Sequence, residues 1–166
     1  MIRYPKDYNP VHEYWEKIQS GQENVGKKIR VIIEKLNRDS LNATGEYYYS
    51  PSRANHAIEF IENYCRHSKG KMGGKPVILE LWEKAIIAAT FGFIGIDGNR
   101  QYREVILIVG KKNGKSLIAS AVGLYLMVAD SEAGADVYSV ATKKDQAKII
   151  WLEARRMVKK SPSLLK

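Results

Sequence analysis

The feature that most constrains what this chain can fold into is a glycine- and lysine-rich loop between two apolar segments. Residues 105–109 read Val-Ile-Leu-Ile-Val, a continuous apolar run typical of a strand covered on both faces. Residues 110–116 follow as Gly-Lys-Lys-Asn-Gly-Lys-Ser, and a helical pattern runs from Lys115 to about Ala129. A strand, a glycine-rich loop and a helix in this order are typical of a phosphate-binding loop.

The loop departs from the full P-loop pattern at one position. That pattern has a glycine, four residues and then Gly-Lys-Ser/Thr, so the first glycine would fall on Val109, whereas Gly110 comes one place later. The alternative is a basic surface turn that contains Gly-Lys-Ser by chance. Phosphate binding is favoured because this Gly-Lys pair, unlike those at residues 26–27 and 70–71, lies between a buried-type strand and an apolar helix.

Each residue type in the loop suits the chemistry of phosphate binding. Gly114 lets the backbone approach a phosphate, and the amides of residues 113–116 can point toward it at the start of a helix. Lys115 is placed to reach the β- and γ-phosphates, and the Ser116 hydroxyl to bind Mg²⁺. The candidate phosphate-binding residues are Gly110, Lys111, Lys112, Asn113, Gly114, Lys115 and Ser116.

Strand-like segments lie on both sides of the loop. Residues 91–96 and 102–109 are separated by Asp97-Gly98-Asn99, a hairpin-turn signal, and residues 137–141 form another apolar run. The final helix is expected to begin with Thr142 and Asp145 in capping-box spacing. Strand, helix, strand and helix in this order predict an α/β fold that contains the first strands of a P-loop sheet.

The first ninety residues have the periodicity of short helices instead. Apolar stripes lie within residues 11–18, 29–36, 54–65 and 79–90. The third helix is expected to begin at Pro51, with Ser50 as its N-cap, and to end near residues 69–70. Two polar loops, residues 42–49 with three tyrosines at their end and residues 70–76, are the expected hinges or linkers.

Composition narrows the classes of partner. With 166 residues, 45% of them hydrophobic, the chain can bury a core, which excludes disorder. Its 27 Lys and Arg against 18 Asp and Glu give a net charge of +9, which favours anionic partners such as nucleic acid. The start lacks the apolar core of a signal peptide, and the single cysteine, Cys65, excludes an intrachain disulfide, so we expect a soluble intracellular protein.

Several motifs in one order resemble the N-terminal ATPase part of the large terminase subunit of tailed bacteriophages. The likeness covers about residues 45–160 and includes the Lys-Asn-Gly-Lys-Ser loop, in a family whose members commonly lack the first P-loop glycine. Its other components are an aromatic stretch, Phe60-Ile61-Glu62, His67, Lys69-Gly70, Gly74, Pro76, Leu79, Trp82, Phe91-Gly92, Ala141-Thr142 and Gln146-Ala147.

The resemblance implies an additional-strand ATPase that couples ATP hydrolysis to DNA packaging into the capsid, with ATP and Mg²⁺ as cofactors. It implies Lys115 as the catalytic residue and Ser116 as the magnesium residue, with Lys111 where family members often carry an arginine. The family reads adenine with a glutamine beside a tryptophan, so Trp82 and Glu83 are the adenine-side candidates here, although an ionised glutamate only accepts hydrogen bonds.

The resemblance also implies a domain organisation and partners. Residues 1–90 would form a helical, lid-like segment, and residues 91–166 the first part of the P-loop ATPase core. The implied partners are double-stranded DNA, the portal, the small terminase subunit and further copies of the chain, in the cytoplasm of the bacterial host.

No acidic magnesium motif is evident. Residues 126–132 are similar to an acidic magnesium motif but are better explained as a polar helix end. Asp97 also follows an apolar run, but it belongs to the hairpin turn. We therefore expect an N-terminal fragment that is inactive alone. The alternatives are a basic nucleic-acid-binding module whose loop holds phosphate without hydrolysis and, less favoured, a small-molecule kinase. His56, Cys65 and His67 match no structural zinc spacing.

Basic residues are concentrated in the last helical segment. Residues 143–160 carry seven lysines and arginines and only Asp145 and Glu153 as acidic residues. A solvated helix face explains this composition most simply. The alternative is contact with DNA phosphates or with the nucleotide of a neighbouring subunit.

Overall fold

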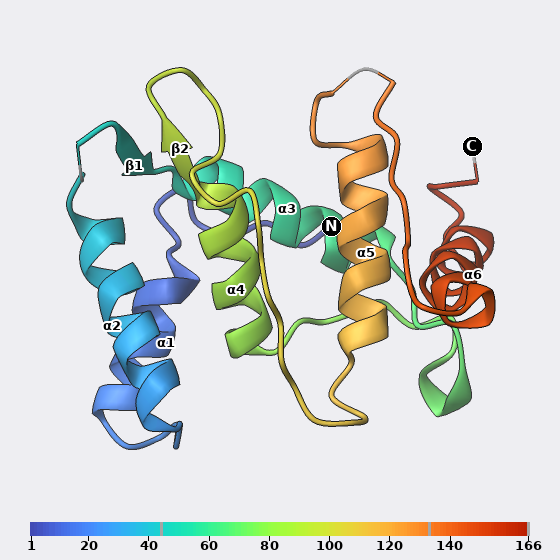
Figure 1. Ribbon diagram of the computed structural model, residues 1–166, viewed down its shortest axis with the longest axis horizontal. Helices are drawn as coiled ribbons and strands as arrows, with labels where there is room; N and C mark the ends of the chain where they lie inside the picture. Colours follow the sequence, from blue (N-terminus) through green and yellow to red (C-terminus); the bar gives the residue numbers. More distant parts are fainter. Residues whose placement is uncertain (44, 133, 166) are drawn as a thin grey trace. The chain divides into compact units, whose positions relative to one another are not determined.

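The computed structural model describes residues 1–43, 45–132 and 134–165 as helices with one small sheet (Figure 1). Thr44, within the predicted 42–49 loop, lies outside the described residues, as do Ala133 and Lys166. The fold class is α/β, as predicted. The elements are α1 (Pro10–Gln19), α2 (Lys27–Leu41), β1 (Tyr47–Tyr49), α3 (Pro51–Tyr64), the 3-10 turn η1 (Gly70–Met72), α4 (Leu81–Gly92), β2 (Phe93–Gly95), α5 (Lys115–Val128) and α6 (Lys144–Lys160).

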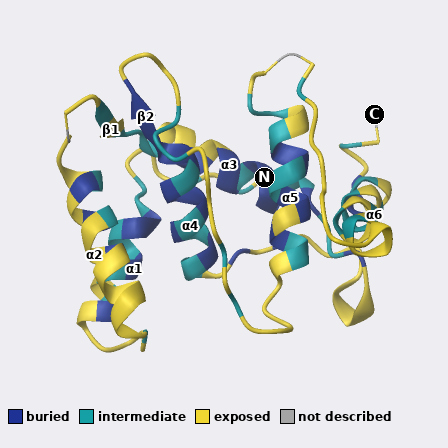
Figure 2. Cartoon of the chain, in the orientation of Figure 1, coloured by how far each residue is buried: buried dark blue, intermediate teal, exposed yellow. Residues whose placement is uncertain are grey.

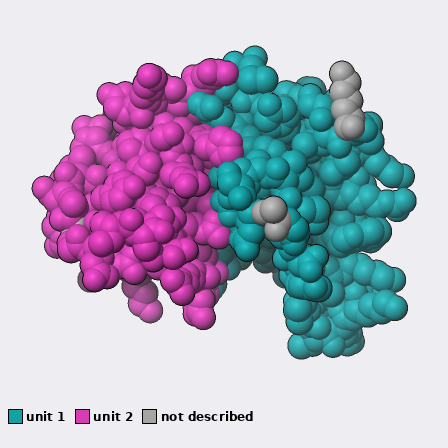
Figure 3. Space-filling view, turned by 90° about the horizontal axis from the view of Figure 1, so that it is seen from above, with its two compact units in different colours: residues 1–2, 59–78, 107–166 teal, residues 3–58, 79–106 magenta. Residues whose placement is uncertain are grey.

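The chain divides into two compact units (Figure 3). Unit 1 contains residues 1–2, 59–78 and 107–166, and unit 2 contains residues 3–58 and 79–106. The candidate phosphate-binding loop therefore belongs to unit 1, together with α5 and α6. The division into residues 1–90 and 91–166 stays a prediction.

The core of unit 2 lies among α1, α2 and α4. Tyr14, Ile18, Ile33 and Ala85 form a buried cluster, with Trp82 among the half-buried residues packed against it. The predicted stripes of α1 and α4 thus face a core, whereas α2 is mostly exposed (Figure 2). Of its predicted stripe, only Ile33 is buried and Leu36 half-buried, while Ile29 and Ile32 are exposed.

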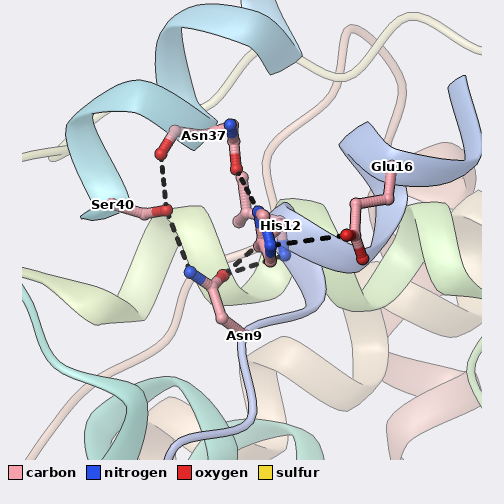
Figure 4. A network of polar contacts seen from close by, with 6 residues as sticks. Asn9, His12, Glu16, Asn37 and Ser40 are labelled. Atoms are coloured by element: carbon pink, nitrogen blue, oxygen red, sulfur yellow. Dashed lines mark hydrogen bonds and ion pairs between the residues drawn. The ribbon is translucent and has the colours of Figure 1, made fainter. Parts of the chain in front are cut away.

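A polar network joins the start of α1 to the end of α2 (Figure 4). The Asn9 side chain caps α1 by accepting the Val11 and His12 amides, and its Nδ2 donates to Ser40 Oγ at 2.9 Å. Asn37 Oδ1 lies 2.8 Å from His12 Nδ1. The side chains of Asn9 and Asn37 each hydrogen-bond to a residue of the other helix segment, so the network holds α1 against α2.

The small sheet joins the tyrosine segment to the end of α4. β1 and β2 pair antiparallel, with Tyr49 opposite Phe93. Their rings make an edge contact, with centroids 5.2 Å apart. A Cβ on Gly92 would lie 2.5 Å from Tyr49 Cε2, so glycine is required for this close approach. Residues 47–49 were expected in a loop and form a strand because β2 offers them a partner.

The hairpin turn is confirmed, but its strands are shorter than predicted. Gly98 has φ 81°, and the Gly95 amide donates to the Asn99 carbonyl at 2.8 Å. Residues 91–92 finish α4, so the strand expected over 91–96 is reduced to β2. Aromatic packing of Tyr49 and Phe93 holds this short ladder.

The strands expected at residues 102–109 and 137–141 are absent from the described residues. Ile106, Ile108 and Val140 are 83%, 89% and 89% exposed, which overturns the expectation of a strand covered on both faces. An apolar run becomes a buried strand only where a neighbouring strand takes its hydrogen bonds and another layer covers its side chains. The described part of the chain supplies neither at these two segments.

Two helix ends also differ from expectation. α3 begins at Pro51 as predicted but ends at Tyr64, because the following residues form a loop in which the Val77 amide donates to the Cys65 carbonyl at 3.1 Å. α6 starts at Lys144 after the N-cap Lys143, which makes no side-chain cap. The predicted Thr142 capping box is therefore wrong.

Candidate functional site

Two left-handed residues turn the loop between residues 110 and 116. Lys112 has φ 69° and Gly114 has φ 66°, a region that non-glycine residues seldom occupy. A Cβ added to Gly110 would lie 3.2 Å from Asn113 Nδ2, so the loop folds back on itself there. The glycines thus serve the loop's conformation, and residues 110–115 are exposed.

The loop ends at the N-terminus of α5, which carries free amide donors. Gly114 is the N-cap and supplies no side-chain cap, and the first turn contains no acidic residue. The Ile118 amide donates to the Gly114 carbonyl at 2.9 Å, whereas the amides of residues 115–117 have no acceptor within the helix. Together with the helix dipole and the Lys115 ammonium, these amides favour an anion at this helix end.

Ser120 fixes the start of α5 against α6. Its side chain is fully buried, and Oγ lies 2.7 Å from the Ser116 carbonyl oxygen and 2.9 Å from that of Ile150. One hydroxyl proton therefore serves carbonyls on both helices. The role of Ser120 was not predicted from the sequence, where its only signal is a hydroxyl in an apolar stretch of helix.

Aromatic and apolar packing supports the same helix pair. Tyr125 of α5 packs edge-on against Phe60 of α3, with centroids 5.6 Å apart, and Met157 of α6 is fully buried. α5 is therefore held on two sides.

The adenine-side candidates are Trp82 and Glu83. Both belong to unit 2, whereas the loop at residues 110–116 belongs to unit 1. Trp82 packs against the buried cluster of α1, α2 and α4. Glu83 is 8% exposed, and its Oε2 accepts the Glu80 amide at 2.8 Å in a capping box. The carboxylate thus already satisfies a helix terminus, a role that the sequence analysis did not predict.

Acidic side chains form no metal-binding group in the part of the chain that the structure describes. Asp97 lies in the hairpin turn, where its Oδ1 accepts the Asn99 amide, and Asp130 follows the end of α5, as expected of both. Burial raises the pKa of the Cys65 thiol to about 12, so this cysteine is not a nucleophile at neutral pH.

Comparisons with known proteins identify the family. A family model described as "Terminase large subunit, ATPase domain" matches residues 81–166, slightly more than half of the chain. The chain belongs to this terminase family. It is also 31% identical over 114 residues to the "Terminase, large subunit" of Enterobacteria phage HK97, a match that covers 68% of this chain and 22% of that protein. No solved structure matches.

The family match places the main structural features within the terminase ATPase domain. Its range begins at α4, with Trp82 and Glu83, and continues through β2, the glycine-rich loop, α5 and α6. Among the described residues, no helix is long and apolar enough to span a bilayer.

Replacing Glu83 by glutamine in this terminase ATPase domain is expected to stabilise it slightly at neutral pH. Burial raises the pKa of the Glu83 carboxyl, the Glu80 charge adds to this, and the Glu80 amide opposes it. The folded protein therefore takes up the proton at higher pH than the unfolded chain, so wild-type stability rises as pH falls through the folded pKa toward the unfolded value. Glutamine keeps the oxygen that accepts the Glu80 amide but does not titrate, so the Glu83→Gln variant should lack this increase in stability at low pH.

Urea unfolding at several pH values measures the effect. Glu83→Ala is the matched variant, because it loses the cap and should cost about 1 kcal/mol at neutral pH. An unchanged pH dependence in Glu83→Gln would contradict the burial argument.

Proposed function

We propose that this domain hydrolyses ATP in the motor that packages DNA into a phage capsid. The family match supports the proposal, and the N-terminus of α5 carries it. Uncapped amides lie there beside Lys115 and Ser116, after a loop turned by left-handed residues at Lys112 and Gly114. The match to the HK97 relative covers 22% of that protein's length, so the activity and partners of a whole large subunit are proposals for this chain.

The donors fit the phosphate tail of a nucleotide. The amides of residues 113–116 would hold the phosphate oxygens. Lys115, as the catalytic residue, would contact the β- and γ-phosphates and stabilise the charge that develops on the oxygen between them as the bond breaks. The Ser116 hydroxyl would bind Mg²⁺, which neutralises phosphate charge when bound. Three features of the loop favour an anion. Gly110 has no side chain, the first turn of α5 has no carboxylate, and the Lys115 ammonium lies at the start of that helix.

Further residues complete the proposed nucleotide site. Lys111 would take the charge-neutralising role of the arginine in related loops, and Lys112 would add positive charge. Trp82 and Glu83 are proposed on the adenine side, where Glu83 can contact the base only by leaving its capping box. The family resemblance supports a core of the additional-strand P-loop type for the terminase ATPase domain.

For the domain roles and the partners, we propose those that the family resemblance implies. Residues 1–90 would act as the lid-like segment and residues 91–166 as the first part of the ATPase core. The motor would act on double-stranded DNA with the portal, the small terminase subunit and further copies of itself in the host cytoplasm. The 166-residue chain alone would turn over ATP negligibly, because a magnesium carboxylate and a water-orienting group are also needed.

Amide chemical shifts in an NMR titration test the phosphate site, first with inorganic phosphate and then with ATP and Mg²⁺. We expect the largest shifts at residues 113–116. The start of α2 is an internal control, because its N-cap Gly26 also lacks a side-chain cap and precedes Lys27 and Lys28. Equal shifts at both helix starts would show only a general helix-end effect and would contradict the proposal.

A further inference from the structure

One exposed side of α6 is basic along the whole helix. Lys144, Lys148, Trp151, Arg155 and Lys159 are spaced by four, three, four and four residues, which places them in one stripe. All five are exposed, Trp151 by 56%. At 1.5 Å per residue the stripe is roughly 22 Å long. We call these five residues the α6 stripe.

The α6 stripe contains no carboxylate. Asp145 lies beside the stripe in the first turn, and Glu153 projects from another side of the helix, where it accepts a hydrogen bond from Ser68 Oγ. Within the described residues, none of the four cations is within ion-pair distance of an acidic side chain. An ordinary solvated helix is different, as α1 shows, since Lys17 there pairs with Glu13 at 3.6 Å. The stripe therefore presents uncompensated positive charge.

Trp151 supports one of these cations. The Arg155 guanidinium lies over the indole ring, 5.6 Å from its centroid. The ring limits the freedom of the arginine side chain, and a guanidinium binds phosphate through two parallel hydrogen bonds. An exposed indole next to cations is also suited to a nucleic-acid surface.

We propose that the α6 stripe binds the phosphate backbone of double-stranded DNA without reading its sequence. The inference rests on the proposed function and names the surface that contacts its substrate. A line of cations about 22 Å long matches the repeated charges of a duplex. A membrane helix would need an exposed apolar face, whereas the opposite side of α6 packs against α5, with Met157 buried. Ser120 ties this helix to the turn that carries Ser116.

Fluorescence anisotropy with a labelled DNA duplex tests the proposal on the 166-residue chain. Four phosphate contacts give a salt slope of about −3.6, so wild-type affinity should fall about 10²-fold between about 50 and 200 mM salt. The variant Lys144→Gln, Lys148→Gln, Arg155→Gln and Lys159→Gln should bind weakly and lose most of this salt dependence.

A variant with the same loss of charge provides the control. Exchanging the exposed Lys27, Lys28, Lys71 and Lys75 for glutamine also lowers the net charge by four, from +9 to +5. This control should keep the wild-type salt slope. Circular dichroism and the urea midpoint establish that both variants are folded.

Three results would overturn the proposal: equal loss of DNA binding in the control, no loss in the stripe variant, or stripe-dependent binding to anionic lipid vesicles with none to DNA. The result is independent of the phosphate site. Shifts at residues 113–116 should persist in the stripe variant, and their absence in the wild type would count against the proposed ATPase alone.

Discussion

Replacing Lys115 by alanine is expected to lower ATP turnover by the complete packaging motor by at least about 10²-fold, since a positioned charge that acts on the transition state contributes on this order. Lys115 is exposed at the first position of α5, next to amides that the helix leaves free. The loss should lie mainly in kcat, because negative charge builds on the oxygen that leaves with the β-phosphate as its bond to the γ-phosphorus breaks. A phosphate-release assay with and without DNA measures it.

Lys71→Ala is the matched control, because Lys71 is an exposed lysine of the same unit, in the turn η1. It should leave turnover unchanged. The 166-residue chain should hydrolyse ATP only at a background rate, both in the wild type and in Lys115→Ala. Robust turnover by these 166 residues that disappears in Lys115→Ala would contradict this expectation.

Phe93→Ala should lower the free energy of unfolding of unit 2 by about 3–5 kcal/mol, a large part of the stability of a typical domain. Phe93 is 1% exposed and packs edge-on against Tyr49 and Tyr102, with centroids 5.2 and 5.6 Å away. Its removal leaves a cavity under the only ladder among the described residues. Urea unfolding, followed by circular dichroism, measures the loss.

Tyr48→Ala is the matched comparison in the same sheet. Tyr48 is 46% exposed, so its truncation should change stability by less than about 1 kcal/mol. Phe93→Leu keeps most of the volume and should stay folded even if Phe93→Ala does not, with a cost of about 1–2 kcal/mol. Similar costs for Tyr48→Ala and Phe93→Ala would show that Phe93 is not central to the packing.

Features that depend on a few neighbouring residues were predictable from the sequence. Pro51 starts α3 because its fixed φ suits the first helical position, and Asp97-Gly98-Asn99 turns the chain because glycine accepts a positive φ. The loop at residues 110–116 precedes a helix that starts at Lys115, as its composition indicates. The family was also identified correctly from linked motifs in one order.

Features that depend on distant partners were not predictable. The strand at residues 47–49 exists because β2 lies beside it, and the apolar runs at 102–109 and 137–141 stay unpaired because the described residues offer them no neighbour. Ser120 and Glu83 likewise gained their roles from groups that only folding, or a helix end, brings within reach.

The sequence by itself determined that α3 starts at Pro51, that α5 follows the glycine-rich loop and that the chain turns at Gly98. These features follow from backbone preferences that act over a few residues. Tertiary structure alone decided which apolar segments are covered, and that α6 turns Met157 inward and the α6 stripe toward solvent. The physical reason is that burial and pairing are relations between segments. A strand's hydrogen bonds and a helix's inner face exist only with respect to the element packed against them.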